Sequence, residues 1–476
     1  VVAIAYHLDA AGEAEQAGEM YLVGAERAMG SLGGDECLRI VERALARVEP
    51  GTSHHRRALE LKESALTLLG RQDERRAILD DLLELLDGAT DARRLLQVRG
   101  RSIRLSYELG DLDRVEVEAG SLVEDARAAG DEHVVGSALR QLHMVYRDRG
   151  DHDRALELLD QAVALFSAQD DTEGIWATLV SRGICLRQSG RLRLALDAYL
   201  NALEIVTDAG LSRQEINTRI NLGLLYVNLG EYDKARTNYS QALIAIRNHG
   251  FVRDEAAALV NQGHLFLVSG DHSMAQHTLT RAVRLARSTR DNLALCDALL
   301  TLGVLHLARG HLREADALIR KGLRVARDLG HVYLSIQGSL CLAAVCLALG
   351  THDAVREALE HAQLATSLGT ERGLGWGELK GMSLSAQAHL ELGDPETALG
   401  LSQGAVDRLS EQEIEDAESV WARHASIAAA AGDADGAEHA RSRASDIVER
   451  IKANIGDGKA RKRYLQSPRI RAILEA

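Results

Sequence analysis

The chain has 476 residues, of which 46% are hydrophobic, 26% charged and only 3% aromatic, and its formal net charge is −14. This acidic balance argues against general nucleic-acid binding, which requires a basic face. Five cysteines occur without CxxC spacing, so we expect small buried side chains in a reducing compartment rather than disulfides. The longest apolar run, Leu340 to Leu349, is too short to cross a bilayer, and no signal peptide is recognisable. We therefore expect a cytoplasmic protein that does not contact a membrane.

Glycine recurs every 40 residues along most of the chain, which indicates a repeat array. In one copy, Gly223 and Tyr226 share a face of a first helix, and Gly230 ends that helix. Ala235 and Tyr239 continue the stripe on a second helix at helical spacing. The unit is therefore a helical hairpin that turns at a glycine in left-handed conformation. The turn glycines of the series are Gly70, Gly110, Gly150, Gly190, Gly230, Gly270, Gly310 and Gly350.

This pattern resembles the tetratricopeptide repeat (TPR), in which a first helix carries Leu-Gly and then an aromatic residue, and a second carries Ala, aromatic and Ala. The small positions allow two helices to cross closely. The resemblance implies an all-α fold, a TPR-like α-solenoid whose antiparallel hairpins form a right-handed superhelix. A period of 40 rather than 34 implies helices about one turn longer. The small position of the first helix is filled by Gly183, Gly223, Gly263 and Gly303.

The repeat pattern divides the chain into three regions. Residues 1–52 form irregular opening hairpins that would join the array to a missing N-terminal module. Residues 53–452 form a regular array of about ten hairpins of 40 residues. Residues 453–476 form a basic tail, which either caps the last hairpin or contacts an acidic partner or another domain.

An acidic residue follows several turn glycines, as in GDHDRA (150–155), GEYDKA (230–235) and GDPETA (393–398). A carboxylate at a helix N-terminus accepts hydrogen bonds from unpaired backbone amides and compensates the helix dipole. We expect these acidic residues to be structural.

Both ends resemble the C-terminal repeat arrays of bacterial multidomain STAND-type signalling ATPases, the class that contains the maltose-regulon activator. The segment AYHLDAAGEAEQAGEMYLVGAERA (5–28) is similar to the hairpin that follows the ATPase and winged-helix modules. The segment RYLQSPRIRAIL (463–474) is similar to the motif that closes the chain. The resemblance implies an array that senses a ligand and controls an attached output module. We interpret the sequence as a fragment of a larger bacterial signalling protein.

The sequence contains none of the motifs GxxxxGK[ST], HExxH or GxSxG. The histidine pairs 54–55 and 272 with 277 have no further partners at metal-ligand spacing. We therefore predict no enzyme activity, no metal site and no cofactor.

The concave groove, which first helices line in this family, is the expected binding surface. Fixed offsets from each turn glycine (3, 6, 9 or 13 residues back) and their neighbours define an arginine-rich zone, a central asparagine and histidine zone, and an apolar C-terminal zone. The first comprises Arg101, Arg104, Arg140, Arg147 and Arg187; the second Asn217, Asn221, Asn228, Asn261 and His264; the third Val304, Leu307, Leu340, Ala344 and Leu347.

Asparagine is slightly unfavourable inside a helix, so its recurrence invites a functional reason. Its amide both donates and accepts, and a ladder of asparagines can pair with the backbone of an extended peptide. The arginines would attract the acidic part of such a peptide. The alternatives are solvated groove residues for the asparagines and surface ion pairs for the arginines.

The sequence thus favours a non-enzymatic sensor and regulatory module that binds a protein or peptide segment of acidic character, or an intramolecular output domain. One alternative is a small-molecule inducer-sensing domain of a signalling ATPase, and another is a self-assembly scaffold. Low aromatic content weighs against sugar binding, which uses ring faces, whereas the asparagine ladder favours a peptide.

Overall fold

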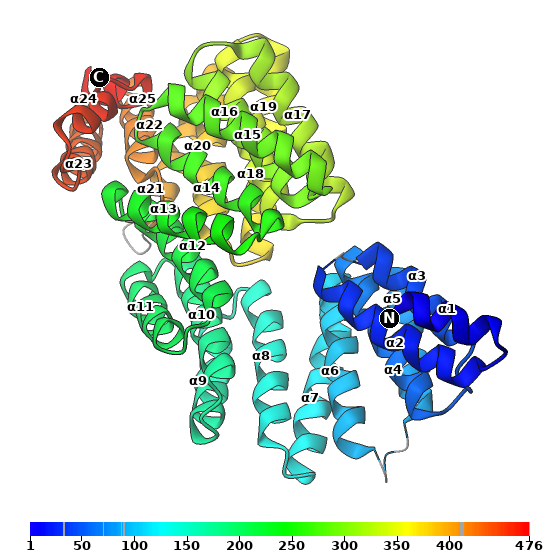
Figure 1. The fold of residues 1–476 in the computed structure, drawn as a ribbon. Coiled ribbons are helices and arrows are strands. Elements are labelled where there is room, and N and C mark those ends of the chain that lie inside the picture. Colours follow the sequence, from blue (N-terminus) through cyan, green and yellow to red (C-terminus); the bar gives the residue numbers. More distant parts are fainter. Residues whose placement is uncertain (32–33, 70, 87, 89–90, 410–413, 476) are drawn as a thin grey trace. The chain divides into compact units, whose positions relative to one another are not determined.

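A computed structural model describes residues 1–31, 34–69, 71–86, 88, 91–409 and 414–475 (Figure 1). Its regular structure within these residues consists of 25 helices and includes no strand, so the all-α prediction is confirmed. The chain divides into two compact units. Unit 1 comprises residues 1–145 and 160–170, and unit 2 comprises residues 146–159 and 171–476.

Unit 1 is built on the first seven helices and a shared hydrophobic core. Tyr21, Leu22, Leu66 and Leu79 are among its fully buried side chains. Helices α8 (Glu132–Asp148) and α9 (His152–Ala168) are divided between the two units. The helices of unit 1 are α1 (Val2–Ala10), α2 (Ala14–Ser31), α3 (Gly34–Leu45), α4 (Ser53–Leu69), α5 (Gln72–Leu85), α6 (Ala92–Glu108) and α7 (Leu112–Ala128).

Unit 2 is a series of antiparallel hairpins in which each helix packs on its sequence neighbours, followed by two short terminal helices (Figure 1). Its helices are α10 (Thr172–Gln188), α11 (Leu192–Asp208), α12 (Ser212–Asn228), α13 (Tyr232–His249), α14 (Val252–Val268), α15 (His272–Thr289), α16 (Asn292–Ala308), α17 (Leu312–Asp328), α18 (Val332–Leu349), α19 (His352–Glu371), α20 (Gly375–Glu391), α21 (Pro395–Leu409), α22 (Ala417–Ala430), α23 (Ala434–Ala453), α24 (Gly458–Gln466) and α25 (Pro468–Glu475).

The turn glycines adopt the left-handed conformation that the sequence predicts. Gly230 has φ +72°, its amide donates to the Val227 carbonyl oxygen at 3.0 Å, and the next amide, of Glu231, donates to the Tyr226 carbonyl oxygen at 2.8 Å. This pattern closes the helix end because a left-handed residue there satisfies otherwise unpaired carbonyls. Gly70 lies outside the described residues. The remaining members of the series, Gly110, Gly150, Gly190, Gly270, Gly310 and Gly350, also have positive φ.

A second series of left-handed residues, which the sequence analysis did not identify, links one hairpin to the next. It recurs with the same period of 40 but is not always glycine, because Asp170 and Arg290 occupy two of its positions with φ +53° and +54°. Its glycine members are Gly130, Gly210, Gly250 and Gly330.

The small positions of the first helices are explained by the aromatic or aliphatic residue 16 positions later. A Cβ on Gly223 would lie 2.4 Å from the Tyr239 ring, and one on Gly183 would lie 2.5 Å from the Tyr199 ring. Both tyrosine side chains are fully buried. The glycines therefore permit the close crossing of the two helices in each hairpin, as the pattern indicates.

Aspartate fulfils the predicted capping role after a turn glycine, whereas glutamate does not. Asp151 accepts a hydrogen bond from the Arg154 amide at 3.1 Å, and Asp394 accepts one from the Thr397 amide at 3.1 Å. Glu231 makes no such bond, and instead its carboxylate pairs with Lys234 Nζ at 2.6 Å. Glu231 is therefore structural, as predicted, but it acts through an ion pair rather than as a cap.

Helix α18 passes a length and hydropathy test for a membrane span, the only helix in the described part of the chain to do so. Its 18 residues extend beyond the shorter apolar run counted in the sequence. About 56% of it is buried, and α17 and α19 pack against it as in a core helix of a repeat array.

The C-terminal tail packs within unit 2. Helix α25 contacts α22 and α23 (Figure 1). Tyr464 on α24 lies edge-on to Tyr232 of α13, with ring centroids 5.9 Å apart. Arg463 lies 3.5 Å from Asp271, and its carbonyl lies so close to Gly270 that a Cβ there would be 2.6 Å away. The tail therefore contacts hairpins far from it in sequence as well as the last hairpin.

Candidate functional site

The arginines that the sequence groups into one zone belong to different units. Arg101 and Arg104 on α6 and Arg140 on α8 lie in unit 1, whereas Arg147 and Arg187 lie in unit 2 with the whole asparagine and histidine set. We therefore describe the two groups separately.

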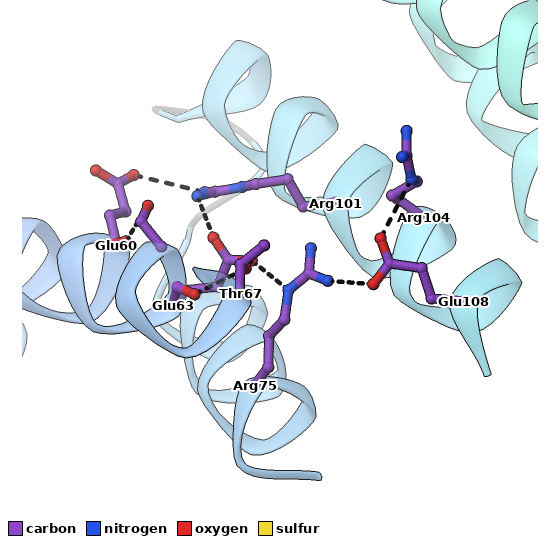
Figure 2. Close-up of polar contacts among 8 residues, drawn as sticks. Glu60, Glu63, Thr67, Arg75, Arg101, Arg104 and Glu108 are labelled. Atoms are coloured by element: carbon purple, nitrogen blue, oxygen red, sulfur yellow. Dashed lines mark hydrogen bonds and ion pairs between the residues drawn. The ribbon is translucent and has the colours of Figure 1, made fainter. Parts of the chain in front are cut away.

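In unit 1, Arg101 and Arg104 belong to an ion-pair network that joins α4, α5 and α6 (Figure 2). Arg75 lies at its centre, with Nε 2.6 Å from Glu63 Oε1 and Nη1 2.7 Å from Glu108 Oε2. Arg101 Nη1 lies 3.3 Å from Glu63 Oε2, and Arg104 Nε lies 3.2 Å from Glu108 Oε1. The positive charges of both predicted residues are thus matched inside the unit. Binding of a peptide by these arginines stays a prediction.

In unit 2, the first helices of the hairpins contact one another through the series α10, α12, α14, α16, α18, α20 and α22. We call the surface formed by the polar residues of these helices the inner face. It includes Asn217, Asn221, Asn228, Asn261, His264 and Lys380. Asn217 and Asn221 share one helix face of α12, where Asn221 Nδ2 donates to Asn217 Oδ1 at 3.0 Å. Arg147 pairs with its neighbour Asp148 at 2.7 Å. Asn261 is half-buried on α14.

The structure brings Asn228 and His264 together through Glu415, a residue that the sequence analysis did not single out. Asn228 Nδ2 donates to Glu415 Oε2 at 3.4 Å, and His264 Nε2 lies 3.1 Å from Glu415 Oε1. These three residues come from α12, α14 and the connection between α21 and α22. Two residues of the predicted central zone therefore hold a carboxylate of the chain itself.

The neighbouring residue Asp416 extends this contact. Its carboxylate lies 3.2 Å from Lys380 Nζ of α20 and also accepts a hydrogen bond from Arg469 of α25. Arg469 Nη1 lies 2.6 Å from Glu418 Oε1 as well. Asp416 has φ +64°, a conformation that a non-glycine residue rarely adopts and that tends to occur at functional sites. We call residues 414–418 the acidic segment.

The acidic segment exists because one connection between hairpins is longer than the others in unit 2. Two or three residues separate most successive hairpins, whereas α21 ends at Leu409 and α22 begins at Ala417. Helices α21 and α22 have 15 and 14 residues instead of the usual 17, so the repeat period is nearly kept while the connection lengthens. The sequence feature that could have indicated this segment is the cluster of acidic residues at 415–418, at a place where a short turn was expected.

The charges of the acidic segment and the inner face are coupled. Burial lowers the pKa of His264, but Glu415 more than reverses this effect and leaves the pKa raised. Burial raises the pKa of Glu415 and of Asp416, but their cationic neighbours outweigh burial and leave both pKa values lowered. The pKa of Lys380 is raised, because Asp416 and Glu415 outweigh its burial. At neutral pH the face therefore holds ionised carboxylates.

The expected apolar zone at the C-terminal end differs from the structure. Leu340 and Leu347 are buried in the hydrophobic core of the hairpins. Polar residues face inward instead, among them Asp297 and Lys380, each 13 residues before a turn glycine. Arg423 donates to Ser383 Oγ at 2.7 Å. The predicted apolar zone is therefore wrong for Leu340 and Leu347, whereas Val304, Leu307 and Ala344 are half-buried.

Comparison with known proteins agrees with this architecture. Residues 134–208 and 175–248 match the tetratricopeptide repeat, and residues 214–370 match the MalT-like TPR region. The chain is therefore a TPR array, and the resemblance seen in the sequence is confirmed.

Solved structures with a similar fold have low sequence identity. The Rap conjugation gene regulator of the plasmid pLS20, in complex with the Phr* peptide, has 14% identity and a TM-score of 0.50, over 71% of this chain and 90% of that one. The quorum sensor NprR from B. thuringiensis has 15% identity and a TM-score of 0.48, over 73% and 97%. A STAND protein with a TPR sensor from Pyrococcus horikoshii has 18% identity and a TM-score of 0.43, over 69% of this chain and 52% of that one.

Proposed function

We propose that the chain is a non-enzymatic sensor module whose inner face in unit 2 binds an extended, acidic segment of a protein or peptide. The observation that carries this proposal is the docking of the chain's own Glu415 and Asp416 on Asn228, His264 and Lys380. The acidic segment is thus an internal stand-in for the ligand.

The chemistry of the face suits such a ligand. Asn228 donates from a neutral amide, whereas His264 and Lys380 donate from groups that carry or can carry positive charge. Hydrogen bonds to an ionised carboxylate contribute roughly 1.5–3 kcal/mol each, more than bonds between neutral groups. Asn217, Asn221 and Asn261 lie on the same helices and would pair with the backbone of a longer segment.

Because the acidic segment already occupies the face, an external ligand has to displace it. The apparent affinity of the wild-type chain is then lower than that of a chain whose own segment cannot dock. Binding and release of the acidic segment would change the contacts of α22 and of Arg469 on α25. This displacement gives a physical route from ligand binding to a response at the C-terminal end of unit 2.

The similarity of fold to a Rap regulator that binds the Phr* peptide supports a peptide ligand. We further propose that the chain is a cytoplasmic fragment of a larger bacterial signalling protein. In this arrangement residues 1–52 connect the array of residues 53–452 to an output module, and residues 453–476 close the array.

The proposal is tested with a fluorescent synthetic peptide of residues 409–420, LSEQEIEDAESV. Its binding is measured by fluorescence anisotropy to the wild-type chain and to the double variant Glu415→Gln/Asp416→Asn. We expect the variant to bind at least about tenfold more tightly, because its own segment no longer competes. Adding His264→Ala to the double variant should weaken binding again.

The matched control is the double variant Asp353→Asn/Glu396→Gln, which neutralises two exposed carboxylates outside the inner face. It should bind the peptide as the wild type does. A peptide in which every Glu and Asp is replaced by Gln or Asn should bind neither protein. Absence of binding to the Glu415→Gln/Asp416→Asn variant, after circular dichroism shows that it is folded, would overturn the proposal.

A further inference from the structure

We propose that Arg187 is the centre of an oxyanion-binding site on the inner face, distinct from the residues that hold the acidic segment. The site would take a carboxylate or phosphate group of the ligand. This inference rests on the proposed function, because the oxyanion belongs to the segment that the inner face binds. It adds the position at which that segment is anchored.

The first observation is that Arg187 has no acidic partner among the described residues. It lies in the last turn of α10, and its Nε is buried without a hydrogen bond there. In contrast, Lys380 pairs with Asp416, and Arg469 pairs with Asp416 and Glu418. A half-buried guanidinium without a counter-ion is costly, so its retention indicates that an anion completes the site.

The second observation is a pair of buried phenols beside Arg187. Tyr199 and Tyr239 are fully buried; the Tyr199 hydroxyl interacts with Arg187, and neither hydroxyl has an acceptor in the part of the chain that the structure describes. Both rings are held in place because each packs on a glycine of the facing helix, Gly183 or Gly223. Buried tyrosine hydroxyls normally find a partner. Two hydroxyls without an acceptor, beside an arginine without a counter-ion, indicate a shared missing acceptor.

These hydroxyls are suited to donate to an anion. Burial raises the pKa of Tyr199 and of Tyr239, so both stay protonated at neutral pH. Arg187 acts against this rise in both cases, whereas Glu415 adds to it for Tyr239. Arg187 lies one helical turn after Gly183, the residue that packs on the Tyr199 ring, so the guanidinium and this hydroxyl come from facing helices, α10 and α11; Tyr239 lies on α13.

The third observation is an aromatic pair that comes from the C-terminal half of unit 2. Tyr333 on α18 and Trp376 on α20 have ring centroids 4.8 Å apart, and Arg187 influences the pKa of the Tyr333 hydroxyl. The Trp376 Nε1 atom is buried and lacks an acceptor among the described residues. Indole nitrogen can only donate, so it adds a further donor to the set.

The donor set selects the ligand chemistry. A guanidinium and several hydroxyl or indole donors match the lone pairs of a carboxylate or phosphate, and Arg presents its donors in a planar fork. A neutral ligand would leave the charge of Arg187 uncompensated. The structure therefore assigns an oxyanion to this position. The experiment below distinguishes a carboxylate from a phosphate as the bound group.

The experiment uses the full chain and two free probes, sodium acetate and inorganic phosphate, at constant ionic strength set with chloride. The readout is the melting temperature, together with tryptophan fluorescence because Trp376 lies at the site. We expect at least one probe to raise the melting temperature of the wild type by about 2 °C or more relative to chloride. A shift with acetate alone identifies a carboxylate, and a larger shift with phosphate identifies a phosphate.

Arg187→Met removes the charge but keeps an aliphatic side chain, and it should abolish the shift. Tyr239→Phe removes only a hydroxyl and should weaken probe binding several-fold, which keeps the proposal testable if Arg187→Met does not fold. Arg193→Met is the matched control, because Arg193 is exposed on α11 and pairs with Glu231, and it should retain the full shift.

The inference is overturned if neither probe shifts the wild type, or if Arg187→Met and Tyr239→Phe both shift as the wild type does. Its failure is separable from that of the proposed function. If the labelled peptide binds the Glu415→Gln/Asp416→Asn variant but no probe shifts the wild type, only the oxyanion site fails. If the probes act through Arg187 but the peptide does not bind, only the acidic-segment proposal fails.

Discussion

Gly373, in the turn between α19 and α20, lies against Gly150, in the turn between α8 and α9, so closely that a Cβ on Gly373 would be 2.1 Å from the Gly150 Cα. His152 Nε2 lies 3.0 Å from the Gly373 carbonyl oxygen and strengthens this contact. Two turns that are far apart in sequence therefore touch within unit 2. Helices α10, α12, α14, α16 and α18 of the inner face lie between these two turns in the sequence.

The glycine contact predicts that Gly373→Ala destabilises unit 2 by at least about 2 kcal/mol, because the methyl group meets backbone and the residue has positive φ. Gly310→Ala is the matched control, since Gly310 has φ +76° but nothing within 4 Å of its Cβ position. It should cost only about 1 kcal/mol. Urea unfolding followed by circular dichroism measures both. Equal costs would show that the Gly150 contact does not hold in solution.

The helix crossing in each hairpin predicts that Gly223→Ala costs about 1–3 kcal/mol, because the new methyl group overlaps the Tyr239 ring. Gly120→Ala on α7 should instead stabilise unit 1 by about 0.5–1 kcal/mol, since the site is open and alanine favours a helix. Thermal unfolding of the two variants checks the opposite signs. A stabilising Gly223→Ala would contradict the close crossing.

The buried ion pair of unit 1 predicts a large effect for Glu63→Gln. The side chains of Arg75 and Glu63 are 6% and 4% exposed, so removal of one charge leaves the other buried and should cost about 3–5 kcal/mol. Glu74→Gln is the control, because its pair with Arg71 is about half exposed and should contribute at most about 1 kcal/mol. Denaturant unfolding measures both variants. A small effect of Glu63→Gln would show that Glu108, the second carboxylate paired with Arg75, compensates.

Docking of the acidic segment should depend on pH through His264. The groups that influence its pKa are Glu415, Asp416 and Asp297, and the net effect is a raised pKa. Because the pKa of His264 is raised in the folded state, its contribution to the free energy of unfolding is complete below pH 6.5, the ordinary pKa. This contribution is lost as the pH rises through the folded-state pKa. Because the pKa of Glu415 is lowered in the folded state, its contribution to the free energy of unfolding is present above pH 4.5, the ordinary pKa. This contribution is lost as the pH falls through the folded-state pKa.

The stability difference between the wild type and Glu415→Gln should therefore be largest between about pH 5 and pH 6.5 and shrink on both sides. An NMR titration of His264 should show a pKa above 6.5 in the wild type and a lower one in Glu415→Gln. The His331 ring, whose pKa burial lowers, serves as the internal reference. An unchanged His264 titration in the variant would contradict the ion pair.

The sequence by itself determined the repeat architecture, because the signals for a hairpin are local. The glycine at each turn, the small residue on the first helix and the aromatic or aliphatic residue 16 positions later all lie within one repeat, as Gly223, Gly230 and Tyr239 show. Helical periodicity places such residues on known faces without any knowledge of distant parts. The exceptions were chemical details, such as Glu231, whose side chain forms an ion pair in place of a cap.

Only the tertiary structure decided which polar residues meet. Arg101 is matched by Glu63 on another helix, and His264 is matched by Glu415, 151 positions further on. Such pairs depend on small rotations between successive hairpins, which add up along the array and leave no periodic trace in the sequence. That Arg187 has no carboxylate partner among the described residues is likewise visible only in three dimensions, because it depends on the neighbours of the side chain rather than on its position in a repeat.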